Sequence, residues 1–257
     1  MLYALSDIHG HLDILKTVLE KIELSGENKL ILLGDYIDRG PQSGETLRYI
    51  YELQQENGAD KVIVLRGNHE EMFLEWLDTY CGANAGKQDR YGLIPYNPWL
   101  ETDRGYSTFR SLITKQQWQD FAGKTVKAID DALNIEAAKM VLSTGGELIK
   151  WMKDMPYYYE TEKQIFVHAG IDEEAGEWWR LGTPEYVFTG KFPASKGSFY
   201  KDIIAGHIGT YKLAHDGKYH DIYHDGQSHY YIDGTVYVSG KIPILAYDEK
   251  CGKYSQL

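Results

Sequence analysis

Three short motifs with carboxylate and imidazole side chains each follow an apolar run near the start of the chain. The motif "SDIHG" follows "LYAL", "GDYIDRG" follows "KLILL", and "RGNHE" follows "KVIVL". Further along, "HAG" follows "QIFV" and "GH" follows "DIIA". These motifs supply oxygen and imidazole donors and no thiol, a set that suits manganese, iron or zinc better than copper or a thiolate zinc site. A divalent metal centre is therefore the first chemistry to consider.

The segments around these motifs have the pattern of strand, loop and helix. Each apolar run predicts a buried strand, and apolar side chains recur at helical spacing after the first three motifs, as in "HLDILKTVLEKI". Three successive units of this kind predict a parallel, doubly wound sheet. In such a sheet, the residues that follow the strands gather at one edge, where ligands bind. The side chains expected there are Asp7, His9, Asp35, Asp38, Asn68, His69, His168 and His207.

This set holds more donors than one metal ion needs. A carboxylate can bridge two cations, and two cations about 4 Å apart can bind both the attacking and the leaving oxygen of a phosphoryl transfer. A dinuclear site is therefore the hypothesis. Each motif alone has a simpler interpretation: "SDIHG" as a turn with a helix cap, "GNHE" as a loop before acids in a first helical turn, and "DRG" as a surface turn. Their ordered recurrence at strand ends favours the shared site.

The rest of the chain divides into two parts. Gly, Asn and Pro punctuate "CGANAGKQDRYGLIPYNPW", and helix-like segments such as "GGELIKWMKDM" follow, so residues 78–155 predict an inserted helical lobe. From residue 164 strands return, and the Asp-Gly pairs in "KYHDIYHDGQSHYYIDGTVYV" predict hairpin turns in an antiparallel C-terminal sheet. The remaining histidines are interpreted as surface or strand residues: His11, His215, His220, His224 and His229.

Composition and charge exclude some classes of function. A net charge of −11 and a pI near 5.3 disfavour nonspecific binding to nucleic acid or an anionic membrane, because the mean field repels polyanions. Cys81 and Cys251 lie far apart without metal-binding spacing, which indicates reduced thiols. The start "MLYALSDIHG" lacks a basic signal-peptide region, and no apolar run approaches the roughly 20 residues of a membrane span. We therefore expect a cytoplasmic protein without a membrane anchor. Its oligomeric state is left open.

The motifs resemble those of the calcineurin-like metallophosphoesterases, specifically the PPP phosphoprotein phosphatases and their bacterial and phage relatives. The family pattern of Gly-Asp-x-His-Gly, Gly-Asp-x-x-Asp-Arg-Gly, Gly-Asn-His-Glu, His-Ala-Gly and Gly-His is similar to "SDIHG", "GDYIDRG", "RGNHE", "HAG" and "GH". The likeness covers residues 1–77 and, more loosely, 155–248. It implies an α/β fold, a four-layer α/β/β/α sandwich, in which residues 1–257 form one domain with 78–155 as its inserted helical lobe.

The resemblance also implies how the site residues divide their work. The implied metal ligands are Asp7, His9, Asp35, Asn68, His168 and His207, with Asp35 bridging two divalent ions. Manganese is the expected metal, with iron or zinc as alternatives. His69 then stays free as the catalytic acid, Asp38 orients it, and Arg39 binds phosphate oxygens, a role suited to a planar charged fork. A second phosphate-binding arginine is expected after the fourth motif, where "EWWRLG" offers Arg180.

The implied reaction is hydrolysis of a phosphomonoester by a metal-bridging water, without a covalent phosphoenzyme. The expected substrate is a phosphorylated protein or a small phosphoester, as for a serine/threonine-type protein phosphatase. A symmetrical dinucleoside tetraphosphate hydrolase shares the metal core and is the nearest alternative. A catalytically silent metal-binding interaction domain would lack His69, Arg39 or a ligand, and all are present. A nucleic-acid phosphodiesterase would need a basic stripe that the sequence lacks.

Three positions depart from the family pattern. Ser6 stands where the first Gly is usual, and Ile208 follows His207 where relatives usually carry Thr. The segment "WLETDRGYSTF" occupies the place where bacterial relatives often have Asn-Gly-Gly. Contacts to the substrate are therefore the part of the resemblance that transfers least.

Overall fold

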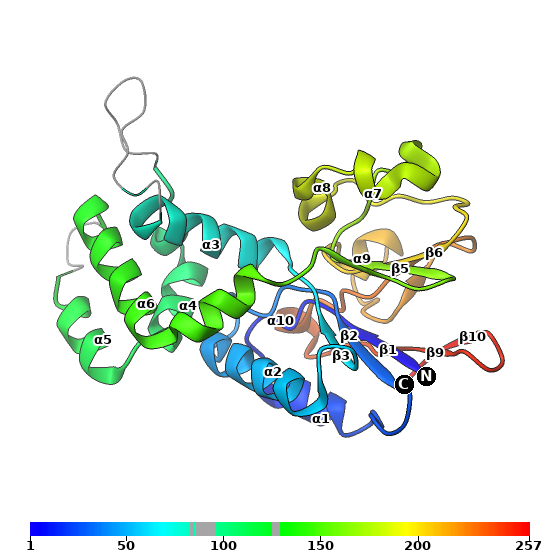
Figure 1. Ribbon diagram of the computed structural model, residues 1–257, viewed down its shortest axis with the longest axis horizontal. Helices are drawn as coiled ribbons and strands as arrows, with labels where there is room; N and C mark the ends of the chain where they lie inside the picture. Colours follow the sequence, from blue (N-terminus) through cyan, green and yellow to red (C-terminus); the bar gives the residue numbers. More distant parts are fainter. Residues whose placement is uncertain (83–84, 86–95, 125–128) are drawn as a thin grey trace.

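Two mixed β-sheets pack face to face, with helices on their outer faces (Figure 1). The computed structural model of the protein describes residues 1–82, 85, 96–124 and 129–257. Sheet A has the strand order β10-β9-β1-β2-β3, and sheet B has the order β4-β5-β6-β8-β7. The first strand of the chain, β1, lies in the centre of sheet A, and the last strand, β10, forms one of its edges.

Sheet A contains the three predicted strand-loop-helix units. Strands β1, β2 and β3 are parallel, and β9 and β10 extend the sheet antiparallel to β1. The strands are β1 (Leu2–Leu5), β2 (Lys29–Leu32), β3 (Val62–Val64), β9 (Leu245–Asp248) and β10 (Lys253–Gln256). The helices that follow the first three strands are α1 (Leu12–Leu19), α2 (Ser43–Asn57) and α3 (Asn68–Cys81). The predicted units are thus confirmed.

Sheet B is not the antiparallel sheet expected for the C-terminal part. Its central strands β5, β6 and β8 are parallel, and only the edge strands β4 and β7 run antiparallel to their neighbours. The strands are β4 (Tyr158–Glu160), β5 (Gln164–Val167), β6 (Asp202–Ala205), β7 (Tyr223–His224) and β8 (His229–Tyr231). The short helices beside it are η2 (Glu173–Trp178), α7 (Trp179–Gly182), α8 (Glu185–Gly190) and α9 (Thr210–Leu213). The last helix, α10 (Val236–Ser239), follows β8, and its Val236 packs in the buried cluster of sheet A and its helices.

One of the two predicted hairpin turns is confirmed and the other is wrong. Asp225 and Gly226 lie between the antiparallel strands β7 and β8. After Asp233 and Gly234 the chain instead enters α10, where "TVYV" had the alternation of a strand. Thr235 has φ 55°, and its backbone N–H donates to Asp233 Oδ1 at 2.6 Å, so the chain turns before a strand can form.

The buried side chains form three layers that follow the alternation of the strands. One face of sheet A packs on α1, α2 and α3 through residues such as Leu5, Leu32 and Val64. Its other face packs against sheet B, with Ile31 and Ile204 in the shared cluster. The outer face of sheet B packs against the short helices. The protein is therefore a four-layer α/β/β/α sandwich. The doubly wound arrangement is wrong, because sheet B covers the face where a second helix layer would lie.

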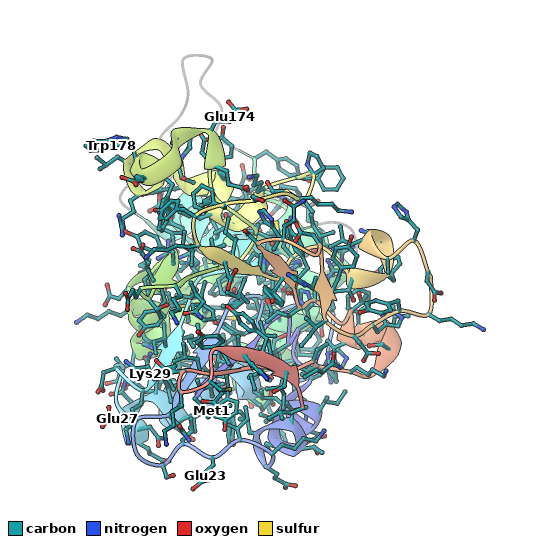
Figure 2. The ribbon with its side chains drawn as sticks, turned by 90° about the vertical axis from the view of Figure 1, so that its right-hand side faces the viewer. Met1, Glu23, Glu27, Lys29, Glu174 and Trp178 are labelled. Carbon is teal, nitrogen blue, oxygen red and sulfur yellow. The ribbon has the colours of Figure 1, made fainter. Side chains whose placement is uncertain are left out.

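Figure 2, turned by 90° from Figure 1, shows side chains filling the space between these layers. Trp178 lies at the outer edge of the layer over sheet B (Figure 2), and 73 % of its surface is exposed. Among the described residues, no helix has the length and apolar character needed to cross a membrane. Cys81 and Cys251 are both free thiols.

The described part of residues 78–155 is helical and extends the helix layer of sheet A (Figure 1). Its elements are η1 (Trp99–Glu101), α4 (Asp103–Leu112), α5 (Lys115–Ala122) and α6 (Asp131–Lys153). Phe109 and Val141 from these helices share one buried cluster with Leu15 and Phe73 from α1 and α3. This segment is thus continuous with the core of the sandwich. Its status as an inserted lobe of a single domain stays a prediction.

A buried ion-pair network away from the strand ends holds the β7–β8 hairpin. His229 Nδ1 lies 3.1 Å from Asp225 Oδ2, and its Nε2 lies 3.1 Å from Glu173 Oε2 on η2. Lys191 Nζ donates to Glu173 Oε1 at 3.0 Å. Burial lowers the pKa of His229, but the Glu173 and Asp225 carboxylates outweigh this and raise it above the ordinary 6.5. A protonated His229 can donate to both carboxylates.

Replacing His229 by Gln removes this cation, and we expect the free energy of unfolding to fall by about 2 kcal/mol at pH 6. Because the folded pKa lies above the unfolded value of 6.5, the contribution is complete below pH 6.5 and disappears as the pH rises through the folded pKa. Urea unfolding at pH 6 and near pH 9 checks this, with His224→Gln on the exposed face of the hairpin as control. Equal losses at both pH values would show that His229 is neutral.

Candidate metal centre

The sequence motifs meet at the carboxyl ends of the parallel strands of both sheets. The loop after β1 pairs with the loop after β2 through backbone hydrogen bonds from Asp7 N to Gly34 O (3.1 Å) and from His9 N to Asp35 O (2.8 Å). From sheet B, the backbone N–H of His207 donates to Asp7 Oδ2 at 2.9 Å. Five motifs from across the chain therefore converge at one place, as predicted from their positions at strand ends.

The backbone at this place is strained. Six residues of the motifs adopt left-handed backbone conformations with φ between 46° and 69°: Asp7, His9, Asp35, Asp38, Arg39 and His207. Such a conformation is unfavourable for a residue with a Cβ atom, by about 1 kcal/mol or more each. Gly34 and Gly67 pass so close that a Cβ atom on Gly34 would lie 2.5 Å from Gly67 N. These glycines are required for the two loops to approach each other.

Glu70, the last residue of "RGNHE", fixes the second loop from inside the protein. Its side chain is fully buried, and Oε2 accepts hydrogen bonds from the backbone N–H groups of Asp35 (2.8 Å) and Gly67 (3.0 Å). Its Oε1 accepts from Tyr36 (2.8 Å) and Ile37 (3.3 Å). One carboxylate thus satisfies four buried donors and sets the left-handed turn that aims Asp35 at the site.

The first set of donors surrounds Asp35. His9 Nε2 lies 3.6 Å from Asp35 Oδ2 and 3.8 Å from Asp7 Oδ1. His168 Nε2 lies 3.4 Å from Asp35 Oδ1. Ligands that each lie about 2.1 Å from a metal ion are roughly 3 to 3.6 Å from one another, so these spacings are close to those of a coordination shell. Asp35 contributes to both groups of side chains that could hold a metal ion.

The second set of donors surrounds Asn68, the first residue of α3. Its Oδ1 lies 3.0 Å from His168 Nε2 and 3.0 Å from His207 Nδ1. The other nitrogens of two imidazoles are held by backbone carbonyls: His168 Nδ1 by Leu33 O at 3.1 Å, and His9 Nδ1 by Ile37 O at 2.9 Å. A carbonyl on one ring nitrogen keeps the proton there and leaves the other nitrogen as a metal ligand.

The protonation equilibria fit this donor role. Burial lowers the pKa of His168 to about 4 and that of His207 to about 3, and it lowers the pKa of His9 well below 6.5. All three imidazoles are thus neutral near pH 7, the form that binds metals. Burial also raises the pKa of Asp7 to about 6 and that of Asp35 well above its ordinary value. Buried carboxylates this close together need a cation to stay ionised, and a divalent metal ion would supply that charge.

His69 differs from the other imidazoles of the site. Its Nδ1 lies 2.7 Å from Asp38 Oδ2, and its Nε2 lies 3.8 Å from Asp35 Oδ2. Distance alone would admit it as a ligand with His9 and Asp35. Burial lowers the pKa of His69, but the Asp35 and Asp38 carboxylates outweigh burial and raise it. A histidine that keeps its proton suits an acid better than a metal ligand.

The helical segment around α4 supports this pair. Thr108 Oγ1 donates to Asp38 Oδ1 at 2.6 Å, and the indole N–H of Trp99 donates to Asp38 Oδ2 at 3.3 Å. Both residues belong to "WLETDRGYSTF", the segment that departs from the family pattern. This segment therefore holds Asp38 through a tryptophan and a threonine.

Arg39 points its guanidinium at the same space. Its Cζ lies 4.5 Å from the ring centroid of Tyr237 on α10, and its Nη2 lies 3.4 Å from His69 Nε2. Its Nε is buried and has no hydrogen-bond partner among the described residues. An unpaired donor on a permanent cation, beside a cluster of metal-ligand types, is arranged to meet an anion.

A model of the calcineurin-like phosphoesterase family matches residues 2–240. The chain belongs to this family. Calcineurin-like phosphoesterases are hydrolases that use divalent metal ions, in agreement with the donor set.

Among curated proteins, this calcineurin-like phosphoesterase is similar to the symmetrical bis(5'-nucleosyl)-tetraphosphatase of Pseudomonas fluorescens strain SBW25, with 39 % identity over 78 residues. The match covers 30 % of this chain and 26 % of the relative, so it spans about a quarter of the relative's length.

Solved structures of two different activities share the fold. A candidate diadenosine tetraphosphatase has a TM-score of 0.54 at 12 % identity and is matched over 100 % of this chain and 92 % of its own. A protein serine/threonine phosphatase from Saccharomyces cerevisiae has a TM-score of 0.53 at 10 % identity, with 100 % and 79 % covered. At these identities the likeness shows the fold alone.

Arg180 does not join the site of this phosphoesterase. Its Nε donates to Glu160 Oε2 at 2.7 Å, and its Nη2 contacts the same carboxylate. Glu160 pairs in register with Ile165, near the start of β5, whereas His168 follows the end of β5. Trp179 is fully buried under sheet B, so its neighbour Arg180 points outward. The phosphate-binding role expected for Arg180 is therefore corrected to a surface ion pair.

Two other side chains at the site were not expected from the sequence. Asp233 is buried there, and burial together with the nearby Asp7 carboxylate raises its pKa to about 7. Tyr237 stacks on Arg39 and lies edge-on to His9, with ring centroids 5.8 Å apart. Both lie in the stretch that was predicted to be a hairpin, so neither was expected at the site. The pair Asp233-Gly234 indicated a polar loop, but it did not indicate that this loop lies beside the metal centre.

Replacing Glu70 by Gln should lower the free energy of unfolding by about 3 kcal/mol, because an amide NH₂ would face two of the four backbone donors. Urea unfolding measures the loss. Glu75→Gln is the matched control on the exposed side of the same helix, and its effect should stay within about 0.5 kcal/mol. Similar values for the two variants would mean that Glu70 does not fix the loop.

Replacing Asp35 by Asn should abolish metal binding and hydrolysis together, because one carboxylate oxygen of the shared donor is lost. Elemental analysis after dialysis, on protein first loaded with manganese, measures the metal content. Arg39→Ala is the control that keeps the metal and weakens only phosphate handling. Two metal ions per chain with full activity in Asp35→Asn would refute the bridging role.

Proposed function

We propose that the protein is a metal-dependent phosphomonoester hydrolase of the serine/threonine protein phosphatase type. The observation that carries the proposal is the position of His69. It is held by Asp38 at 2.7 Å and lies beside both the Asp35 carboxylate and the Arg39 guanidinium. An acid, a cation for phosphoryl oxygens and a metal-binding carboxylate therefore surround one space.

Each residue has a defined task in this proposal. Asp7, His9, Asp35, Asn68, His168 and His207 would hold two divalent ions. Such ions make a water nucleophilic near neutral pH and neutralise charge on phosphoryl oxygens. Arg39 binds and orients the phosphoryl group through its unpaired Nε. His69 gives the proton on Nε2 to the departing oxygen, while Asp38 fixes the ring and stabilises its charged form.

Hydrolysis of a symmetrical dinucleoside tetraphosphate is the second candidate. It is favoured by several curated relatives that carry that name at 36 to 41 % identity over 26 to 33 % of this chain. The matched segments are too short to carry the whole protein's activity. Metal-bound protein should therefore be assayed with a phosphoserine peptide, 4-nitrophenyl phosphate and diadenosine tetraphosphate. The largest kcat/KM identifies the substrate class, and a preference for the tetraphosphate would replace the phosphatase proposal.

Replacing His69 by Asn should leave manganese bound and reduce kcat on a phosphoserine peptide by roughly 10² to 10⁴. The loss should be smaller on 4-nitrophenyl phosphate, because nitrophenolate leaves without needing a proton. Steady-state kinetics on both substrates, with His11→Asn in a neighbouring loop as control, measures the difference. Near-normal kcat on the peptide would rule out His69 as the acid.

A further inference from the structure

The cavity at the metal centre, about 80 Å³, is lined by residues from both sheets. The loops after β1 and β2 and the start of α3 contribute expected ligands together with Arg39 and His69. The other wall comes from the segments that follow β6 and β8 in sheet B, and it includes Lys212 on α9 and Thr235 before α10. Neither Lys212 nor Thr235 is an expected metal ligand, and both can donate a hydrogen bond to an anion.

Lys212 is an exposed cation without a counterion in the described part of the chain. Its Nζ makes no ion pair there and lies 5.7 Å from the ring centroid of Tyr211. Its charge nevertheless acts on the site, because burial, the His168 and His69 imidazoles and the Lys212 ammonium together lower the pKa of His207 to about 3. Where divalent ions occupy the ligand set, a further cation beside them is repelled unless an anion lies between them. Lys212 is therefore placed to meet an anion.

Thr235 presents a buried hydroxyl that lacks a partner. The residue is 3 % exposed, and its Oγ1 has no hydrogen-bond partner among the described residues. A Cβ atom on Gly209 would lie 2.6 Å from this oxygen, so a side chain at that position would collide with the hydroxyl. A buried polar group without a partner destabilises the fold, and one in the wall of a cavity indicates a ligand that satisfies it.

The two residues are positioned together by Thr210, the first residue of α9. Thr210 is fully buried, and its backbone N–H and its Oγ1 both donate to Asp233 O, at 3.0 and 3.3 Å. Two residues further along each segment are Lys212 and Thr235, and Thr235 is itself held by the bond from its N–H to Asp233 Oδ1. The ammonium and the hydroxyl therefore belong to one fastened unit at the edge of the metal centre.

We propose that Lys212 and Thr235 bind oxygens of the substrate's phosphoryl group from the side of sheet B, while Arg39 binds them from the side of sheet A. The proposal rests on the proposed function, because it takes the ligand of this cavity to be a phosphoryl group. The ammonium supplies charge through a flexible stem, and the hydroxyl supplies one hydrogen bond of fixed direction. The second cation of the site thus comes from α9, since Arg180 pairs with Glu160 on the surface.

Isothermal titration calorimetry with inorganic phosphate, on protein loaded with manganese, tests the role of Lys212. Lys212→Met should raise the Kd for phosphate about tenfold at low salt, because one charge-assisted hydrogen bond is lost. The difference from wild type should shrink as potassium chloride is added, since salt screens an exposed cation. Lys212→Arg should restore most of the affinity. Lys218→Met, an exposed lysine beyond α9 that does not line the cavity, is the matched control and should bind as wild type.

Thr235→Val tests the hydroxyl and keeps the shape of the side chain. The Kd for phosphate should rise about fivefold, because one hydrogen bond to the anion is lost. The urea midpoint of the metal-free protein should stay equal or rise, because the variant removes an unsatisfied buried group. A merely structural role of Thr235 would instead lower the midpoint and leave the Kd unchanged.

Unchanged phosphate affinity in Lys212→Met and Thr235→Val overturns the proposal. Equal losses in Lys212→Met and Lys218→Met also overturn it, because the effect would then be one of net charge alone. So does a loss in Arg180→Met as large as that in Lys212→Met. If wild type hydrolyses the phosphoserine peptide while both variants bind phosphate normally, only this inference fails. If wild type binds phosphate through Lys212 and Thr235 but hydrolyses no phosphomonoester, the proposed function fails and the anion site stands.

Discussion

The buried carboxylate of Glu70 is the constraint on which the geometry of the site depends. It accepts four backbone N–H groups, from Gly67 at the start of α3 and from residues 35–37 after β2. These groups lie where the chain makes a left-handed turn and where water does not reach, so they have no other way to be satisfied. By closing that turn, Glu70 joins two strand-to-helix connections into one unit. Asp35 then projects from the junction toward both sheets, which is why one carboxylate can serve two groups of donors.

Strain and charge are concentrated at the same edge of the sandwich and are offset by different parts of the fold. The left-handed residues are tolerated because the strands leading to them are buried on both faces, so the loops cannot relax without disturbing two core layers. The carboxylates are a separate problem, since burial raises the pKa values of Asp7, Asp35 and Asp233. Among the described residues, the permanent cations that line the cavity beside these carboxylates are Arg39 and Lys212. Divalent ions would supply the missing charge, so metal binding and the ionisation of these carboxylates stabilise each other.

The sequence alone predicted which side chains gather at the site, because each of them follows an apolar run that forms a strand. The carboxyl ends of parallel strands lie at the same edge of a sheet, independent of how the rest of the chain packs. It failed where placement depends on long-range packing. The second face of sheet A could be covered by helices or by another sheet, and strand patterns with both faces buried do not distinguish these. Arg180 follows the motifs in order, but the burial of Trp179 turns it away. Trp99 and Thr108 reach Asp38 across more than 60 residues of chain, a contact that no local pattern encodes. The strand-like "TVYV" became α10 because a single turn at Thr235 outweighed its alternation.

The sheets and the helical segment contribute different groups to the site, and Asp38 contacts both. The side chains proposed as metal ligands come from the strand ends and from α3, in the part of the chain that matches the family motifs. The proposed acid, His69, depends on both parts, because its partner Asp38 contacts His69 on one side and Trp99 and Thr108 on the other. Trp99 also lines a cavity beside His69. A substitution in this helical segment therefore alters the setting of the acid and the shape of the space beside it together. Such a substitution can change both the pKa of His69 and the shape of the adjacent cavity, while the side chains proposed as metal ligands keep their positions.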